Sequence, residues 1–305
     1  MDPILAVGSV AFDSIKTPFG EAAHVVGGSA TFFSVAASFF TDVRMVGVVG
    51  EDFGDDEMRV FAGRRIDLEG LERVPGETFR WKGEYGFDLN SRETIYTRLN
   101  AFEGFQPKIP ERYRASPLVF LGNIQPALQA DVLDQVRAPR LVAADTMNLW
   151  IEHARADLER VLRRVDVLII NDSEARELAG HPNLVRAAQR IQAMGPRILV
   201  IKRGEHGVLM TRPDDGGFFA APAMPLDTVF DPTGAGDTFA GGFVGSLAAS
   251  GELTDAAFRR ATIYGSALAS FSVEDFGLNR LLTLSRGEID ARMAEFKRLT
   301  HFDVR

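Results

Sequence analysis

A glycine-rich stretch near the end of the chain holds the residue types best suited to chemistry. It reads DPTGAGD over residues 231–237 and runs into an apolar segment, 239–249, whose apolar positions recur with helical spacing. Thr233 is a residue type that caps helices, and Gly234 and Gly236 would open the first turn. The stretch therefore predicts a glycine-rich loop that leads into the N-terminus of a helix.

Such a helix start attracts an anion, because its first N–H groups have no backbone partner and the helix dipole places positive charge there. Gly234 and Gly236 have no side chain to hold a phosphate away. Asp237 is a carboxylate in the same cradle, and it would repel a phosphate unless it met the hydroxyl that attacks that phosphate. The alternative is an aspartate that only complements the helix dipole. The residues therefore predict a base beside an oxyanion hole.

The whole stretch resembles the ATP-site signature of the ribokinase-like (PfkB-type) carbohydrate kinases, a family that includes ribokinase, fructokinase and adenosine kinase. The resemblance implies an enzyme that transfers the γ-phosphoryl group of ATP to a hydroxyl of a sugar, or of a nucleoside as the alternative. Asp237 would be the general base. Gly234, Ala235 and Gly236 would form the anion hole with it, and Thr233 and Gly236 would contact ATP.

The N-terminal segment carries the predicted acceptor site. Residues 4–10 form a short apolar run typical of a buried parallel strand, and Asp13 follows it, where ligands bind in open α/β sheets. A turn residue is the alternative for Asp13. Gly27 and Gly28 precede an apolar helix at 32–40 and resemble the double-glycine signature of the family, which lets a sugar approach the backbone. The resemblance implies that Asp13, Gly27 and Gly28 bind substrate.

Phe32 departs from the family pattern. Many sugar-specific members carry an asparagine at this position that contacts the substrate, and an aromatic ring cannot supply its hydrogen bonds. The departure favours an acceptor with a flat or apolar part, such as a nucleoside. The other interpretation is that Phe32 simply faces the core.

A change of pattern marks the predicted lid. From residue 77 to residue 102 apolar and polar residues alternate, which predicts two strands around Asn90 and Ser91. With residues 14–26, which read as strand, turn and strand, they would form a small antiparallel sheet that stands off the main domain, as the lid of the family does. Its aromatic residues would cover the active site or form the face of a homodimer.

Beyond Pro107 the apolar segments alternate between strand and helix, which predicts a parallel, doubly wound sheet. We therefore expect the ribokinase-like α/β fold, with a mostly parallel sheet flanked by helices and a small antiparallel lid. Residues 1–305 would form a single domain, into which the lid segments 14–26 and 77–102 are inserted. Closing helices are predicted at 235–249, 255–271 and 285–299.

Two asparagines follow predicted strands. Asn123 comes after 118–121, and Asn148 lies after 141–145 in a stretch that resembles the Asp-x-Asn-x-Arg element of the family, with Leu-Trp in place of the arginine. The resemblance implies that both asparagines line the acceptor pocket. Asparagine after a strand is also a common turn former.

Residues of the predicted nucleotide side follow the next two strands. Asn171 and Glu174 resemble the Asn-x-x-Glu element that organises Mg²⁺ and water around the phosphates, and Ser173 is a candidate helix cap. One carboxylate is enough for this role, because Mg²⁺ is usually held through waters. Lys202 would neutralise an ATP phosphate.

The loop after Lys202 completes the predicted nucleotide site. Gly204 and Gly207 resemble the strand-end Gly-x-x-Gly loop of the family and would contact ATP, whereas Arg203 could equally be a surface charge. In relatives the region after the second closing helix borders a monovalent cation. Asp231 is the side chain expected to touch such a cation, for example K⁺.

Composition excludes several classes. The 34 basic and 42 acidic residues give a net charge of −8, which does not favour nucleic acid or an anionic membrane as a partner. The absence of cysteine excludes disulfides and thiolate chemistry, and the five histidines lack paired ligand spacing. The N-terminus lacks the basic start of a signal peptide and no apolar run reaches the length of a membrane span, so we expect a cytoplasmic protein.

Two other enzyme classes and one binding class can be weighed from motifs. The chain has no Gly-Lys-Ser/Thr phosphate loop and no Gly-x-Gly-x-x-Gly after its first strand, so neither a P-loop enzyme nor a dehydrogenase fits. A sensor that binds a nucleotide or a sugar without turnover is the alternative of another class. Asp237 argues against it, because a pure binder gains nothing from a carboxylate in its phosphate cradle.

Overall fold

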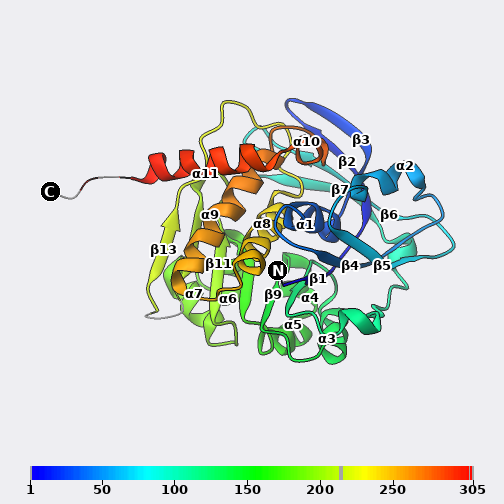
Figure 1. The fold of residues 1–305 in the computed structure, drawn as a ribbon, viewed down its shortest axis with the longest axis horizontal. Helices are drawn as coiled ribbons and strands as arrows, with labels where there is room; N and C mark the ends of the chain where they lie inside the picture. Colours follow the sequence, from blue (N-terminus) through cyan, green and yellow to red (C-terminus); the bar gives the residue numbers. More distant parts are fainter. Residues whose placement is uncertain (1, 213–215, 302, 304–305) are drawn as a thin grey trace.

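In the part of the chain that the structure describes, a nine-stranded sheet forms the centre of the molecule (Figure 1). The computed structural model describes residues 2–212, 216–301 and 303. The strands follow the order β13-β12-β11-β10-β9-β8-β1-β4-β5, parallel from β11 to β5 and antiparallel at the β12-β13 edge. Their bounds are β1 Ile4–Val7, β4 Val43–Val49, β5 Ile66–Arg73, β8 Leu118–Leu121, β9 Leu141–Ala144, β10 Val167–Asn171, β11 Ile198–Lys202, β12 Val208–Thr211 and β13 Phe218–Ala221.

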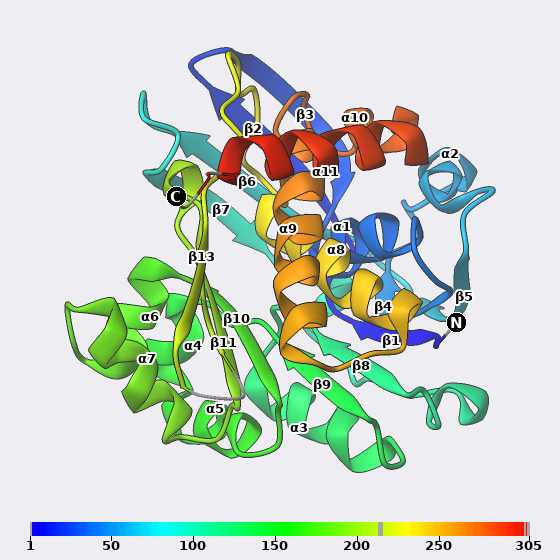
Figure 2. The ribbon, with the colours of Figure 1, turned by 60° about the vertical axis from the view of Figure 1, so that its left-hand side comes forward.

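Helices cover both faces of this sheet (Figure 2). One face packs against α1, α8 and α9, and the other against α3 to α7. The bounds are α1 Ser29–Ala37, α3 Pro126–Gln135, α4 Asn148–His153, α5 Arg155–Leu162, α6 Asp172–Ala179, α7 Leu184–Gln192, α8 Ala235–Ser250 and α9 Asp255–Ser272. Three further helices lie at the periphery, α2 Asp55–Met58, α10 Asn279–Thr283 and α11 Arg286–Thr300. Short 3-10 turns occupy 59–61, 100–102, 111–113 and 204–206.

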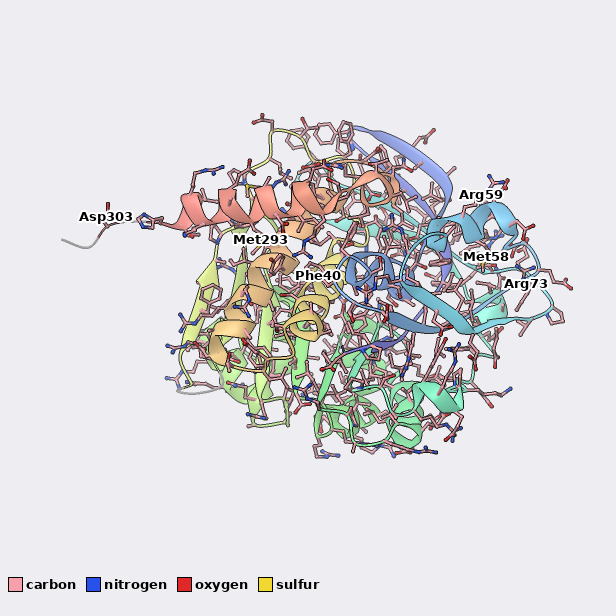
Figure 3. All side chains as sticks on the ribbon, viewed as in Figure 1. Phe40, Met58, Arg59, Arg73, Met293 and Asp303 are labelled. Atoms are coloured by element: carbon pink, nitrogen blue, oxygen red, sulfur yellow. The ribbon has the colours of Figure 1, made fainter. Side chains whose placement is uncertain are left out.

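The continuous apolar sequence of the central strands follows from this layering. Every residue of β1, β8 and β9 is buried, because a strand covered on both faces has no solvent side. Leu5 and Val7 point into the core beneath α3 to α7, while Ile4 and Ala6 point toward α1 and α8. Apolar side chains also fill the space around α1, where Phe40 packs (Figure 3).

A second, four-stranded sheet stands off the main one and forms the lid (Figure 1). Its order is β3-β2-β6-β7, with bounds β2 Ala11–Thr17, β3 Gly20–Gly27, β6 Phe79–Tyr85 and β7 Arg92–Arg98. β2 and β3 form one antiparallel hairpin, and β6 and β7 form another. The two hairpins are joined by a parallel pairing of β2 with β6.

The sequence predicted this fold class correctly, together with both lid segments and the main strand and helix order. Sequence analysis did not place β5, β13, α4 or α10. Strand β5 was not recognised because it is an edge strand of the sheet with mostly half-buried residues, so it lacks a continuous apolar run. None of the helices that the structure describes is long and apolar enough to cross a membrane.

Three local predictions were wrong. Thr233 does not cap α8, because the cap is Gly234 in the left-handed region (φ 73°). Ser173 does not cap α6 either, since the side chain of Asn171 accepts the Glu174 N–H at the start of that helix. The strand predicted at residues 4–10 ends at Val7, and Asp13 lies within β2 of the second sheet, so the alternative that Asp13 is a turn residue is also wrong.

Candidate active site

Charged side chains gather where three neighbouring parallel strands end. Asp145 follows β9, Asn171 ends β10, and Lys202 ends β11 directly opposite Asn171 in the strand register. Because parallel strands deliver their carboxyl ends to the same edge, residues far apart in sequence meet there. Helix α8 begins beside this edge, so Asp237 in its first turn joins the same group.

Lys202 is the cation at the centre of this group. Its ammonium lies 3.5 Å from Asp145 Oδ2, and both side chains are largely buried. Burial opposes its charge, but Asp145, Glu174 and Asp237 outweigh that effect and raise the pKa of Lys202. A Cβ built on Gly236 would stand 2.7 Å from Nζ of Lys202. The glycine therefore lets the lysine lie against the first turn of α8, where a phosphate would add its own negative charge.

Asp237 is the residue that the sequence predicts to be the general base. It is partly buried in the first turn of α8, where its own backbone N–H bonds to its carboxylate. Burial, followed by repulsion from Asp145, raises the pKa of Asp237 to about 7, an effect that Lys202 opposes. A carboxyl with a pKa near neutrality can accept a proton from a hydroxyl and later release it.

The loop before Asp237 is the segment in which the sequence predicts an anion cradle. Gly234 adopts a positive φ, and a Cβ on it would stand 2.5 Å from the ring of Phe32. Only glycine suits this position, because the backbone conformation and the neighbouring ring both exclude a side chain. The Ala235 N–H donates a 3.2 Å bond to the Pro232 carbonyl, which closes the turn ahead of the helix.

Phe32 faces the core rather than the acceptor pocket. It is 1% exposed and packs among the apolar residues around α1 and α9. Its ring lies against Gly234, so the core-facing interpretation of Phe32 is confirmed. Sequence could not decide between the two, since both need a large apolar side chain on the same helix.

Asp13 defines the other side of the site. It is 5% exposed, accepts the Gly28 N–H, and occupies the space that a side chain on Gly27 would need, with Oδ2 only 1.9 Å from such a Cβ. Burial, followed by repulsion from Asp231, raises the pKa of Asp13 to about 7, and Asp237 adds to the rise. The structure thus brings Asp13, Gly27 and Gly28 together. Asp13 is also near enough to Asp237 for the charge of Asp237 to raise its pKa.

A pair of serines holds the double-glycine turn in place. The Ser9 N–H donates to Ser29 Oγ at 3.1 Å, and the Ser29 N–H donates to Ser9 Oγ at 3.0 Å. These reciprocal bonds join the end of β1 to the start of α1. The segment after β1 and the turn that carries Gly28 are therefore attached to each other by side chains.

Glu174 stands at the start of α6 beside the lysine. Its Oε2 accepts the Asn171 N–H at 2.8 Å in a capping box, and the side chain is buried. Burial, followed by repulsion from Asp145, raises the pKa of Glu174 to about 7. Among the described residues, no group of three or more His, Cys, Asp or Glu side chains is arranged to hold a metal ion. A single carboxylate with a spare oxygen fits Mg²⁺ held mainly by phosphates and waters.

Asp231 ties two loops together behind the anion cradle. Its Oδ1 accepts the Thr233 N–H at 2.8 Å and its Oδ2 accepts the Gly277 N–H at 2.9 Å, and the residue is fully buried. Burial raises the pKa of Asp231. The structure therefore gives this carboxylate a clear positioning role, while its contact with a monovalent cation stays a prediction.

The lid reaches the loops of the main domain. The hydroxyl of Tyr85, on β6, lies 3.0 Å from Oγ1 of Thr233, in the glycine-rich loop at residues 231–237. At the tip of the same hairpin, Asn90 Oδ1 stands 3.0 Å from the position of a Cβ on Gly204, in the predicted ATP loop. One face of the lid is thus turned toward the site. Homodimer formation through the lid stays a prediction.

Arg92 is a functional candidate that the sequence analysis missed. It is exposed at the start of β7, pairs in register with Tyr85, and its guanidinium lies 5.2 Å from the centre of the Trp81 ring. Its charge lowers the pKa values of Asp13, Glu174 and Asp237, against the larger effect of burial. The only sequence signal was an arginine directly after the predicted lid turn, which by itself reads as a surface charge.

Two predicted acceptor residues are not brought into this group. Asn123 accepts the Trp150 Nε1–H at 2.8 Å and donates to Met147 Sδ at 3.1 Å, so its amide joins two loops. Asn148 is exposed at the first position of α4. Asp145, from the same stretch, is the residue that the structure places beside Lys202.

The predicted Gly-x-x-Gly loop has one structural and one accessible glycine. Gly207 is buried, and a Cβ on it would stand 2.1 Å from the Ala221 carbonyl, so it is required by packing. Gly204 is exposed, with φ 55°, beneath the lid tip. Contact with ATP stays a prediction for both.

Comparison with known proteins gives a consistent result. The family described as pfkB family carbohydrate kinase matches residues 1–283. A cytidine kinase of Thermococcus kodakarensis is 29% identical, over 79% of this chain and 87% of its own length. A ribokinase of Lactococcus lactis subsp. lactis is 27% identical, over 91% of this chain and 92% of its own length. The crystal structure of a nucleoside kinase of Methanocaldococcus jannaschii has the same fold, with a TM-score of 0.76 at 20% identity over 97% of this chain and 99% of that one.

Proposed function

The chain belongs to the pfkB family of carbohydrate kinases, and on that basis we propose that it transfers the γ-phosphoryl group of ATP to a hydroxyl of a nucleoside, with Asp237 as the general base. The observation that carries the proposal is the position of Asp237. It lies in the first turn of α8, near enough to both Lys202 and Asp13 that its charge raises the pKa of each. A base that is near both a phosphate-binding lysine and a hydroxyl-binding carboxylate suits phosphoryl transfer.

Each side of the site has its own task in this mechanism. Asp13 and the backbone at Gly27 and Gly28 hold the acceptor so that one hydroxyl faces Asp237. Asp237 takes the proton of that hydroxyl as the oxygen attacks the phosphorus, while the backbone at Gly234–Asp237 faces the charge on the transferring group. Positioning and charge stabilisation supply most of the catalysis in such a reaction.

The nucleotide lies, in this proposal, over the edge formed by β10 and β11. Lys202 neutralises a phosphate, and Asn171, Thr233 and the loop from Gly204 to Gly207 border the rest of the nucleotide. Glu174 would hold Mg²⁺ through water, and the ion would supply charge neutralisation and orientation of the phosphates. Asp231 keeps its predicted place beside a monovalent cation, which the assay below tests with K⁺.

The lid favours a nucleoside over a free sugar. Trp81 pairs in register with Asp13, so both side chains project from the same face of the lid sheet. The indole is partly exposed and lies over Gly83, where a Cβ would stand 2.1 Å from the ring. A flat aromatic surface beside a hydroxyl-binding carboxylate suits a base attached to a ribose. The relative named as a cytidine kinase supports the same class.

A free sugar and a non-catalytic sensor are the competing functions. The family name and the relative named as a ribokinase support the sugar. A sensor would bind ATP without producing ADP. The raised pKa of Asp237 disfavours a sensor, because a binder has no use for a carboxylate that stays half-protonated near neutral pH in its phosphate cradle.

The test is ADP release from ATP and Mg²⁺ against a panel of nucleosides and sugars, with and without K⁺. We expect turnover with nucleosides, no turnover in Asp237→Asn, and at least tenfold lower kcat/KM for the free sugars. Turnover confined to sugars would replace the nucleoside with a sugar and leave the kinase assignment in place. Binding of ATP without turnover of any acceptor would favour the sensor.

A further inference from the structure

The loop from Val273 to Gly277 supports the anion cradle from behind. Its Gly277 N–H donates to Asp231, and the carbonyl of Val273 accepts the Phe230 N–H at 2.8 Å. Asp231 in turn holds the Thr233 N–H, one residue before the left-handed Gly234. Any displacement of the loop would therefore be passed through one buried carboxylate to the start of α8.

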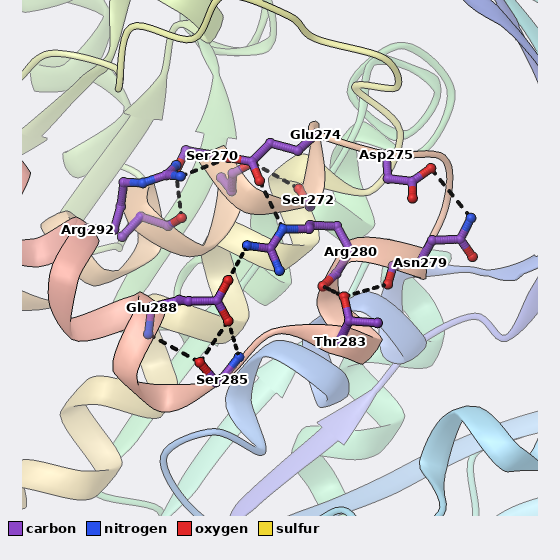
Figure 4. Close-up of polar contacts among 12 residues, drawn as sticks. Ser270, Ser272, Glu274, Asp275, Asn279, Arg280, Thr283, Ser285, Glu288 and Arg292 are labelled. Carbon is purple, nitrogen blue, oxygen red and sulfur yellow. Dashed lines mark hydrogen bonds and ion pairs between the residues drawn. The ribbon is translucent and has the colours of Figure 1, made fainter.

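The same loop is gripped from outside by two arginines (Figure 4). Arg280 Nε donates to Glu274 Oε2 at 2.9 Å, and Arg292 Nη2 donates to Glu274 Oε1 at 2.8 Å. Each oxygen of the Glu274 carboxylate thus receives one arginine. Arg292 also donates to Ser270 Oγ at 2.7 Å, which ties the end of α9 into the same network.

These ion pairs are partly buried and lie against an aromatic ring. The side chains of Arg292, Arg280 and Glu274 are 14%, 22% and 24% exposed. The Arg292 guanidinium lies 4.0 Å from the centre of the Phe271 ring, and the Arg280 guanidinium lies 5.0 Å from it. Partial burial and stacking restrict the orientations of both guanidinium groups, unlike those of mobile surface charges. We call Glu274, Arg280 and Arg292 together the brace.

Arg292 comes from α11, which begins after the last residue matched by the family. Ser285 caps this helix through a capping box with Glu288, and Glu288 also accepts a bond from Arg280 at 2.6 Å. The C-terminal helix is therefore attached to the brace at two points. Figure 4 shows both attachments, with Arg292 and Glu288 reaching from α11 toward Glu274 and Arg280.

We propose that Glu274, Arg280 and Arg292 position the loop from Val273 to Gly277, and through Asp231 also the glycine-rich loop at residues 231–237. Helix α11, which carries Arg292, would then be needed for full phosphoryl-transfer activity. None of the three touches substrate in this proposal; they are positioning residues. The inference rests on the proposed function only for its kinetic readout, because the order of the loop can be measured without turnover.

The physical reason is that an anion hole works only when its N–H groups hold their geometry. In the proposed function the acceptor is held by Asp13 and the double-glycine turn, and none of the hydrogen bonds and ion pairs that the described residues give Glu274, Arg280 and Arg292 involves that turn or Asp13. A less ordered loop from Val273 to Gly277 should therefore lower kcat/KM for ATP and leave the affinity for the acceptor nearly unchanged. A loss of overall stability alone would not produce such a split.

The experiment compares Arg292→Ala with Arg298→Ala, an exposed arginine on the same helix. Steady-state kinetics are measured well below the unfolding temperature, and hydrogen exchange is followed in peptides that contain residues 231–235 and 273–277. For Arg292→Ala we expect kcat/KM for ATP to fall by about 5- to 20-fold, KM for the acceptor to stay within about twofold, and exchange in both peptides to accelerate. Arg298→Ala should match the wild type, and Arg292→Lys should recover part of the loss.

Unchanged exchange in both peptides of Arg292→Ala, or an equal loss toward ATP and acceptor, would overturn the proposal. Should Arg292→Ala fail to fold, Ser270→Ala takes its place, because it removes the hydrogen bond from Arg292 to Ser270 Oγ. We expect Ser270→Ala to lower kcat/KM for ATP by a smaller factor, again with little change in KM for the acceptor. Wild-type hydrogen exchange in both peptides of Ser270→Ala would overturn the proposal. If the wild type turns over no acceptor, the proposed function fails, while the exchange measurement still decides the brace.

Discussion

The hydroxyl of Tyr85 lies 3.0 Å from Oγ1 of Thr233, so a hydrogen bond joins the lid to the loop that we propose as the phosphate-binding loop. Tyr85 is 8% exposed, and Thr233 stands between Asp231 and the left-handed Gly234. This hydrogen bond holds β6 of the lid against the loop at residues 231–237. A contact between two side chains therefore links the site-facing side of the lid to the loop at residues 231–237.

Replacement of Tyr85 by phenylalanine should remove this hydrogen bond and weaken the attachment of the lid. The ring would still fill its place, but Thr233 Oγ1 would lose its partner, a change worth about 1 kcal/mol. We expect kcat/KM to fall by roughly fivefold and hydrogen exchange in β6 and β7 to accelerate. Tyr96→Phe is the matched control, because Tyr96 pairs with Lys82 and points to the opposite face of the lid. Equal effects of the two variants would show that the hydroxyl bond to Thr233 has no special part.

Asp237→Asn should abolish most of the activity without loss of the fold. The amide keeps the shape of the carboxylate but cannot accept the proton, so kcat is expected to fall by about 10²- to 10⁴-fold. Affinity for ATP should be retained or increased, since one negative charge leaves the cradle. Calorimetric binding of ATP beside the turnover assay separates the two effects. Loss of ATP binding in this variant would place Asp237 in nucleotide recognition instead.

The activity should rise with pH through neutrality. The base works only when ionised, and the pKa of Asp237 is about 7 because of burial and of repulsion from Asp145. Lys202 lowers this pKa, so Lys202→Met should move the midpoint of the kcat/KM profile to higher pH, by about one unit. Arg203→Met serves as the control. A midpoint that stays in place in Lys202→Met would remove Asp237 as the titrating base.

The same carboxylates should make the ligand-free protein less stable at alkaline pH. Asp13, Glu174 and Asp237 have pKa values of about 7, above their usual values, so the folded state binds their protons more tightly than the unfolded state. This contribution is complete below about pH 4 and is lost as the pH rises through about 7.

Thermal unfolding at pH 5.5 and pH 8.0 checks the sign of this effect. Asp237→Asn should raise the free energy of unfolding at pH 8.0 by about 1 to 2 kcal/mol and flatten the dependence on pH. A variant that is less stable than the wild type at pH 8.0 would contradict this account of the burial of Asp237.

Arg92→Ala tests the cation that the lid brings to the site. Arg92 influences carboxylates on both sides of Asp237, so its loss should reduce the charge available to the transferring phosphoryl group. We expect kcat to fall by about 10- to 100-fold with a smaller change in KM for the acceptor. Arg98→Ala is the control, because Arg98 lies on the same strand and stacks on Tyr96 at the opposite face. Matching kinetics for the two variants would assign Arg92 to the lid surface.

Sequence was sufficient for the fold class, although not for every strand and helix, because the fold class follows from local patterns. The continuous apolar runs at β1, β8, β9, β10 and β11 predicted buried parallel strands, and the alternation around Asn90 predicted the lid hairpin. The glycine-rich loop predicted the start of α8 and its aspartate. Where two residues of a pattern could serve the same local purpose, as Asn171 and Ser173 could at the start of α6, sequence chose the wrong cap.

Only the tertiary structure decided which of these side chains meet. Asp145 and Lys202 are 57 positions apart in the numbering, and they pair because β9 and β11 flank β10 in one sheet. Arg92 reaches the site because its hairpin folds back over the loops of the main domain, and Phe32 lies beneath Gly234 instead of in the acceptor pocket. The sequence alone determined the chemistry that is available, since residue types and helix starts are local. The direction of each side chain, and with it the electrostatics of the site, depends on long-range packing that no local pattern encodes.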